Sequence, residues 1–145
     1  LWVFGLGVAV FGLGSVATST PLLGVVATAV GSYTLVAVSI GFLMGQIGLG
    51  QHAANAVANI GGMALSFLGG AWVPIEWLPD SLARAARLTP GYWADRAISG
   101  AYEATSMSAA VIGPLLVDCG ICALFAVAVF SVAVAVGRAR ARSAL

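Results

Sequence analysis

The chain contains no lysine, a single histidine (His52) and few charged residues of either sign. A P-loop NTPase needs the lysine of its Gly-x-x-x-x-Gly-Lys-Ser/Thr loop, so this chain is not itself an ATPase. A metal-dependent intramembrane protease needs several histidine and acidic ligands, and a serine protease needs a base beside its nucleophile. One histidine at the edge of an apolar segment supplies neither arrangement. We therefore expect no catalysis, no metal and no bound cofactor in this chain.

The scarcity of charge is matched by an excess of apolar residues. They make up 61% of the chain, against 8% for charged residues, whereas a soluble domain has about 45–50% and about 25%. The six arginines form two small groups rather than one continuous face, which argues against a nucleic-acid partner. We expect a multi-pass protein of the cell (inner or plasma) membrane, with lipid as its surroundings.

Four apolar segments are candidates for membrane helices, at residues 1–16, 22–45, 52–72 and 109–137. A helix needs about 20 residues to span the hydrocarbon; the first segment is shorter, as expected for a fragment that begins inside a helix. None shows the alternation of barrel strands. The sequence predicts an all-α membrane protein, a polytopic bundle with about four transmembrane helices in one domain over residues 1–145. Residues 73–108 form an insert before the last helix, called here the insert.

The placement of arginine predicts the orientation. Arg138, Arg140 and Arg142 follow the last apolar segment with no acid among them, which is typical of a cytoplasmic end. Counting helices back from there places the insert on the extracytoplasmic side. The insert combines prolines, charges and aromatic residues, which belong at a membrane interface. Within it, Asp80 or Ser81 can cap a short helix, and Thr89-Pro90 predicts the restart of a helix, with Thr89 as its N-cap. Two interpretations stay open: a re-entrant helical hairpin that caps the outer mouth of a translocation path, or an amphipathic loop on the membrane surface.

The order of residues around the insert resembles the C-terminal half of ABC-2-type transporter permeases, closest to the branch linked with drug resistance. The matching positions are Gly69, Gly70, Pro74, Glu76, Leu78, Pro79, Leu88, Pro90 and Trp93. The layout is similar along the whole chain, but the specific motif covers only about residues 61–100. Such permeases have six helices per subunit, of which this chain would supply the last four. The coupling helix of the family is absent, and the break at residues 46–51 lacks the charges common there.

The resemblance implies a function in transport rather than catalysis. It implies a permease subunit of an ATP-driven exporter of drugs, lipids or other amphiphiles. It also implies a second permease subunit, in a homodimer, and a separate cytoplasmic subunit that binds ATP and Mg²⁺. Two other classes stay open: a fragment of a secondary transporter or channel, and a membrane scaffold subunit without transport activity. Neither a charged pair at mid-membrane nor a broken helix, which a secondary transporter would need, is visible.

The third apolar segment carries two stripes that bear on packing. Small residues recur every four positions, a spacing that lets helix backbones approach closely in lipid; this small-residue ladder comprises Ala54, Ala58, Gly62 and Ser66. Beside it lie Gln51, Asn55 and Asn59. An amide in hydrocarbon needs a polar partner. These side chains therefore either form hydrogen bonds between helices or, in the case of Asn55 and Asn59, line a polar path through the membrane.

Three residues of the last apolar segment are candidates for special roles. Asp118 lies about 20 residues before Arg138, which places it at the outer boundary of the last helix. We predict that it pairs with an arginine of the insert; recognition of a substrate or cation is the alternative. Cys119 and Cys122 have the CxxC spacing of redox motifs but lack their context. We interpret them as small packing residues.

Overall fold

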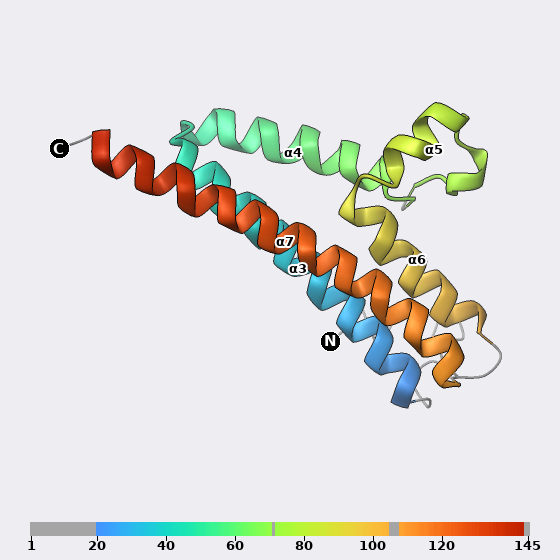
Figure 1. Ribbon diagram of the computed structural model, residues 1–145. Helices are drawn as coiled ribbons and strands as arrows, with labels where there is room; N and C mark the ends of the chain where they lie inside the picture. The colour runs from blue at the N-terminus through green and yellow to red at the C-terminus, as the bar shows by residue number, and fades with distance from the viewer. Residues whose placement is uncertain (1–19, 71, 105–107, 144–145) are drawn as a thin grey trace, which may run out of the picture.

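The computed structural model describes residues 20–70, 72–104 and 108–143, and this part of the chain is helical without strands (Figure 1). The all-α prediction is therefore confirmed there, while the segment predicted at residues 1–16 lies outside the described residues. The elements in chain order are α3 (Thr20–Ile47), α4 (Gln51–Leu68), the short 3-10 helix η1 (Ile75–Trp77), α5 (Asp80–Ala86), α6 (Pro90–Glu103) and α7 (Ala109–Ser143).

Two long helices, α3 and α7, lie side by side and run in the same direction (Figure 1). Near the start of both, Leu22 packs in one cluster with Leu115, and further along Val36 packs with Ala126. Buried residues recur along α3 at alternating spacings of three and four, which is the pattern of a coiled-coil seam, and Leu115, Cys119, Cys122 and Ala126 of α7 have the same spacing. On α3 they are Leu22, Val25, Ala29, Ser32, Val36 and Ser39.

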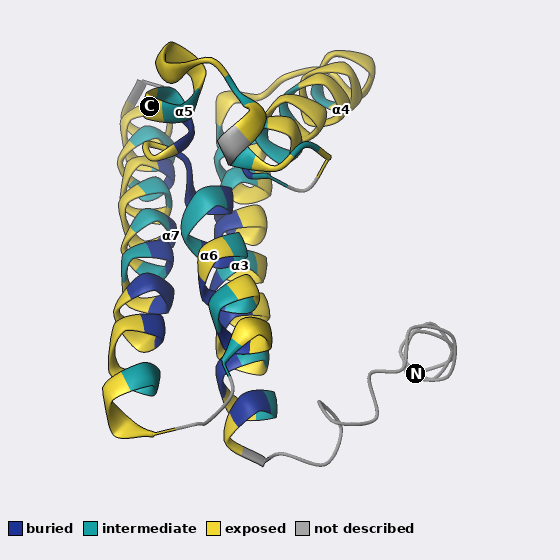
Figure 2. Ribbon diagram, turned by 90° about the vertical axis from the view of Figure 1, so that its right-hand side faces the viewer, coloured by how far each residue is buried: buried dark blue, intermediate teal, exposed yellow. Residues whose placement is uncertain are grey.

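The shorter helix α6 packs against both long helices and runs antiparallel to them. It contributes one buried alanine to each of three clusters: Ala101 lies with Leu115, Ala97 with Cys119, and Ala94 with Cys122. Figure 2 shows the buried residues on the faces that α3, α6 and α7 turn toward one another. Because alanine has almost no side chain, α6 can approach the two long helices closely along its whole length.

Two of the described helices are long and apolar enough to cross a membrane: Pro21–Ile47 within α3 and Ala109–Arg142 within α7. The segment predicted at 52–72 does form a helix, α4, but it ends at Leu68 and is not one of these two. Its first half carries Gln51, His52 and two asparagines, which lower its apolar character. None of its described residues is buried.

The end of α7 differs from the prediction. We expected the last helix to stop at Gly137, with the arginines following it, but α7 continues to Ser143. Alanine and arginine are strong helix formers, and nothing after Gly137 interrupts the helix. Arg140 therefore lies on the helix, where its Nη1 donates a hydrogen bond of 2.6 Å to the backbone carbonyl of Gln46. It thus satisfies a carbonyl at the C-terminal end of α3, which has no partner within that helix.

Within the insert, the predicted restart of a helix at Thr89-Pro90 is confirmed, with Pro90 as the first residue of α6. Thr89 does not cap that helix through its side chain; its Oγ1 donates a hydrogen bond of 2.7 Å to the carbonyl of Ala86 instead. The cap predicted at Asp80 or Ser81 is wrong by one residue. Pro79 takes the N-cap position, so that Asp80 lies in the first turn of α5, where its negative charge complements the helix dipole.

Candidate functional site

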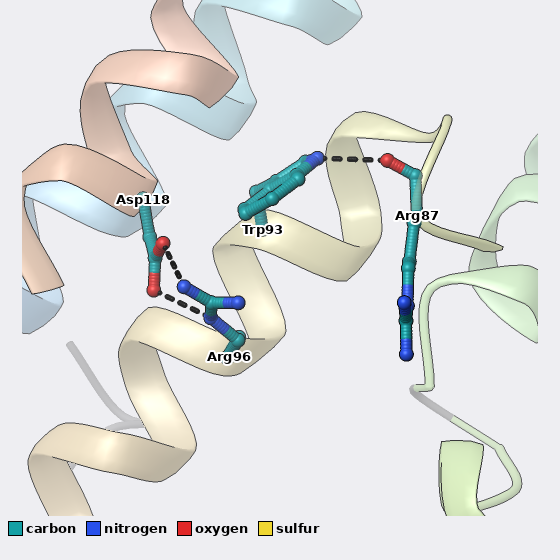
Figure 3. A network of polar contacts seen from close by, with 4 residues as sticks. All are labelled: Arg87, Trp93, Arg96 and Asp118. Carbon is teal, nitrogen blue, oxygen red and sulfur yellow. Dashed lines mark hydrogen bonds and ion pairs between the residues drawn. The ribbon is translucent and has the colours of Figure 1, made fainter. Parts of the chain in front are cut away.

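The strongest polar contact between the insert and a long helix is an ion pair between α6 and α7. The guanidinium of Arg96 donates two hydrogen bonds to the carboxylate of Asp118, from Nε to Oδ2 at 2.8 Å and from Nη2 to Oδ1 at 2.7 Å (Figure 3). The Asp118 side chain is 2% exposed, whereas that of Arg96 is 51% exposed. The predicted pairing of Asp118 with an arginine of the insert is confirmed.

Aromatic rings of α6 surround the same guanidinium. The Arg96 Cζ lies 4.9 Å from the ring centre of Trp93 and 6.0 Å from that of Tyr92. These rings precede Arg96 by three and four positions, which places them on the same helix face. The negative face of an aromatic ring attracts a cation. The hydrogen bonds to Asp118 raise the pKa of Arg96 above its ordinary value, so that this arginine stays charged.

A further hydrogen bond positions Trp93 itself. Its indole Nε1 donates to the backbone carbonyl of Arg87 at 2.9 Å, which ties α6 to the turn that follows α5 (Figure 3). The two rings of Tyr92 and Trp93 meet edge to face, with centres 5.1 Å apart. The side chain of Arg96 is thus held on one side by a carboxylate and on the other by a ring that has a fixed orientation.

A pocket of about 670 Å³ opens beside this ion pair, between α6 and the preceding part of the insert. Its wall includes Arg96 together with Tyr92, and it combines charges of both signs. The other charged residues that line it are Asp80, Arg87, Asp95 and Glu103. Because Asp118 already neutralises Arg96, the remaining lining carries more acidic than basic side chains. The surroundings of this pocket are therefore polar, in contrast to the apolar faces of α3 and α7.

The predicted motif glycines lie where two backbones touch. Gly69 is buried at the C-terminal end of α4, against Gly91 in the first turn of α6. A methyl group placed on Gly91 would lie 3.0 Å from the Cα of Gly69, closer than such carbons normally approach. Gly70 has a φ of 92°, a conformation that glycine adopts readily and other residues avoid. Both glycines are thus required by the geometry that joins α4 to the insert.

The predicted motif prolines mark the starts of helices. Pro74 precedes η1, Pro79 precedes α5, and Pro90 begins α6, where it is buried. Glu76 is the middle residue of η1. Trp93 is half-buried on α6 beside Arg96. The structure therefore gives the motif residues one shared property: they set the path of the chain from α4 through the insert to α6.

A second hollow, largely apolar, lies between α3 and α4 and has a volume of about 540 Å³. Pro90 lines it on the side of α6, and Tyr33 lines it from α3. From α4, three members of the small-residue ladder line it: Ala58, Gly62 and Ser66. A side chain added at Gly62 would meet nothing within 4 Å. These three residues of the ladder therefore face this groove, and the predicted role of the ladder in helix packing stays a prediction.

The polar stripe of α4 does not share that groove. Asn55 and Asn59 are exposed and are not lining residues of the hollow between α3 and α4. Their predicted contribution to a polar path stays a prediction. Cys119 and Cys122 are both free and buried in the contact of α7 with α3 and α6, as expected for packing residues. Among the described residues, no three metal-ligating side chains come together.

The sequence alone does not identify Gly91 or the alanine face of α6. It offers three arginines of the insert as partners of Asp118 and does not decide between them. A spacing of three and four separates Ala94, Ala97 and Ala101, which is the signal of a helix face. Alanine is common throughout the chain, so this spacing did not stand out. Arg96 could have been recognised by Tyr92 and Trp93 on its own face. No protein-family model, curated protein or solved structure matches the chain.

Proposed function

We propose that the chain is part of an ABC-2-type permease, the transmembrane subunit of an ATP-driven exporter. One observation supports this most: the insert that carries the resemblance is built into the packing of the two candidate membrane helices. Its helix α6 lies against both α3 and α7, and Arg96 joins it to the buried Asp118. A loop that merely rests on a membrane surface has no need of an ion pair to a buried carboxylate or of an apolar face against two long helices.

The proposed topology has about four membrane helices. The apolar segment at residues 1–16 and the helix α4 would join α3 and α7 as spans. Arg138, Arg140 and Arg142 would lie at the cytoplasmic end and the insert at the outer end. In this arrangement α6 enters the membrane from the outside, beside the outer halves of α3 and α7, as a re-entrant helix does. Trp72 and Trp77, which are strongly exposed, would lie at the outer interface.

The proposed mechanism requires no bond chemistry in this chain. Two permease subunits would form the translocation path, and a partner subunit would bind and hydrolyse ATP with Mg²⁺. The part of this chain would be to supply helices that shift against one another and an insert that closes the outer end. The exposed ladder residues Ala58 and Gly62 support a second subunit, because they border an open groove in which a methyl group added at Gly62 would meet nothing. Small residues beside such free space suit close contact with another helix.

The proposal is tested by the partners of the full-length protein. We expect an ATPase subunit with a P-loop to co-purify with it from native membranes in mild detergent, and ATP-dependent export to require both proteins. A control purification of an unrelated multi-pass protein identifies subunits that bind without specificity. If the purified protein carries no ATPase and transports a solute under an ion gradient, it is a secondary transporter. If it carries a partner but moves nothing, it is a scaffold.

A substitution on α4 separates contact with a second subunit from folding of the chain itself. A Cβ added at Gly62 meets nothing within 4 Å, and the groove of about 540 Å³ beside it has room for the rest of a leucine side chain, so we expect stability to change little in Gly62→Leu. Export should fall at least tenfold, because a leucine on the ladder keeps the second backbone away. The measurements are export in vesicles and the fraction of dimer in detergent. Ala64→Leu, which faces the hollow on the other side of α4, is the matched control. Equal export by the two variants would contradict the proposal for the ladder.

A further inference from the structure

The helices α3, α6 and α7 form one packed unit from which α4 stands apart. All three buried clusters of the described residues draw only on these three helices, and no described residue of α4 is buried. Contacts outside the clusters also join α3 to α7: the rings of Phe42 and Phe130 stack with centres 5.3 Å apart, and Arg140 bonds to the carbonyl of Gln46. An element with so few buried contacts is the one that moves at the lowest cost in free energy.

The backbone also changes conformation at both ends of α4. Among the described residues, two have a positive φ: Gly48, at 68°, lies before α4, and Gly70, at 92°, lies after it. Gly48 belongs to the turn from α3, and the guanidinium of Arg140 lies against it. This end of α4 is therefore attached to the packed unit through Gly48. Glycine has the largest range of backbone conformations of all residue types.

At the far end of α4, Gly69 meets Gly91 of the packed unit backbone to backbone, and the carbonyl of Leu65 lies beside the same glycine. Gly69 lies on Gly91, and neither has a side chain that could interlock with the other helix. Between this contact and the turn at Gly48 lies the groove of about 540 Å³ that separates α4 from α3. Contact between the backbones of α4 and α6 thus limits how closely the far end of α4 approaches the packed unit.

We propose that α4 is a movable arm that pivots at Gly48 on the packed unit formed by α3, α6 and α7. The contact between Gly69 and Gly91 is the stop that sets the width of the groove at its far end. When this contact separates, α4 moves away from α3 and the groove opens toward the surroundings of the helices. This movement concerns the chain itself and requires neither a transported molecule nor an ATPase, so its test is independent of the proposed function.

The movement is measured as two distances between spin labels in the full chain, with Cys119 and Cys122 replaced by serine. Labelled protein is diluted with unlabelled protein, so that distances between copies do not contribute. The far pair, Ala37→Cys with Ser66→Cys, reports the width of the groove at its far end. The near pair, Leu43→Cys with Val57→Cys, reports the width near Gly48. All four positions line the groove. We expect a broad distance distribution for the far pair and a narrow one for the near pair.

Substitutions at the stop and the pivot supply the decisive comparison. Gly91→Ala places a methyl group against Gly69, so the far pair should shift to longer distances while the near pair stays unchanged. Gly113→Ala on α7, where a methyl group meets nothing within 4 Å, is the control. Distributions of equal width in the two pairs, together with no shift on Gly91→Ala, would overturn the proposal.

The pivot has its own test, which keeps the proposal open to refutation if Gly91→Ala does not fold. Gly48→Ala puts a side chain on a residue of positive φ, where its methyl group also displaces the guanidinium of Arg140. It should change the ratio of the populations seen by the far pair by roughly tenfold. Gly50→Ala is the matched control, because Gly50 has a φ of −59° and free space around it. If Gly48→Ala and Gly50→Ala give the same distributions, Gly48 is no pivot and the arm does not exist.

Discussion

Arg96→Ala is expected to lower the free energy of unfolding by about 3 kcal/mol, because it leaves the carboxylate of Asp118 buried without a partner. Because the guanidinium of Arg96 is half-exposed, we expect a smaller loss of stability than for an ion pair in which both side chains are buried. Arg96→Lys should recover part of it, since lysine keeps the charge but cannot form the two parallel hydrogen bonds. The measurement is unfolding of the purified chain in mixed detergent micelles with increasing SDS, followed by helical circular dichroism.

A double variant shows whether the two side chains act as a pair. Replacing both by apolar residues, as in Arg96→Met with Asp118→Leu, removes the unpaired charge that each single substitution leaves behind. We expect the double variant to be more stable than either Arg96→Met or Asp118→Leu alone. If the effects of the single substitutions simply add, the ion pair contributes nothing beyond the separate side chains. In that case α6 is held by its alanine face only.

Ala97→Leu should dislodge α6 from the two long helices. Ala97 is fully buried and packs with Ala29 of α3 and Cys119 of α7. Adding three carbons to a packed site without free space costs about 1–3 kcal/mol. Because Arg96 precedes it directly, the displacement should also weaken the contact with Asp118. We expect a lower midpoint in the SDS titration. Cys119 should also react faster with a thiol reagent, because α6 covers its thiol in the unchanged chain and would no longer cover it in the variant.

Ser99→Leu is the matched control for this substitution. Ser99 lies on the same helix but is exposed and faces the polar pocket, so a leucine there meets no packed neighbour. In the Ser99→Leu variant, the midpoint of the SDS titration and the reactivity of Cys119 should remain close to those of the unchanged chain. If Ala97→Leu behaves like Ser99→Leu, α6 is not tightly packed against α3 and α7. The insert would then be a surface loop, as in the alternative interpretation of the sequence.

Some features of the site followed from the sequence through charge and chain-breaking residues. A lone carboxylate at the start of a long apolar helix must find a cation, so the pairing of Asp118 with an arginine of the insert could be predicted. Thr89-Pro90 predicted the start of α6, because proline fits the first turn of a helix. Which of three arginines reaches Asp118 could not be predicted. That depends on how α6 is rotated and where it lies along α7.

The close contacts between helices were harder to predict. In α3 and α7 nearly every position is apolar, so the face that packs cannot be separated by hydrophobicity from the face that does not. The ladder on α4 is easier to recognise in the sequence, because its small residues lie beside polar amides. Within the described part of the chain, the small residues that meet neighbouring helices include the alanines of α6, such as Ala97, the alanine of α3 that faces it, Ala29, and the two glycines at the junction of α4 and α6.

The sequence by itself determined the helical class, the breaks around Gly48 and the insert, and the need of Asp118 for a positive partner. These follow from local chemistry: composition, glycine and proline, and the cost of an unpaired charge. Only the tertiary structure decided that α3 and α7 pack directly against each other with α6 against both, that Arg96 is the partner, and that α4 stands apart. Each of these depends on which faces of different helices meet. In a chain that is apolar on all sides, that choice is made by the fit of side chains in three dimensions.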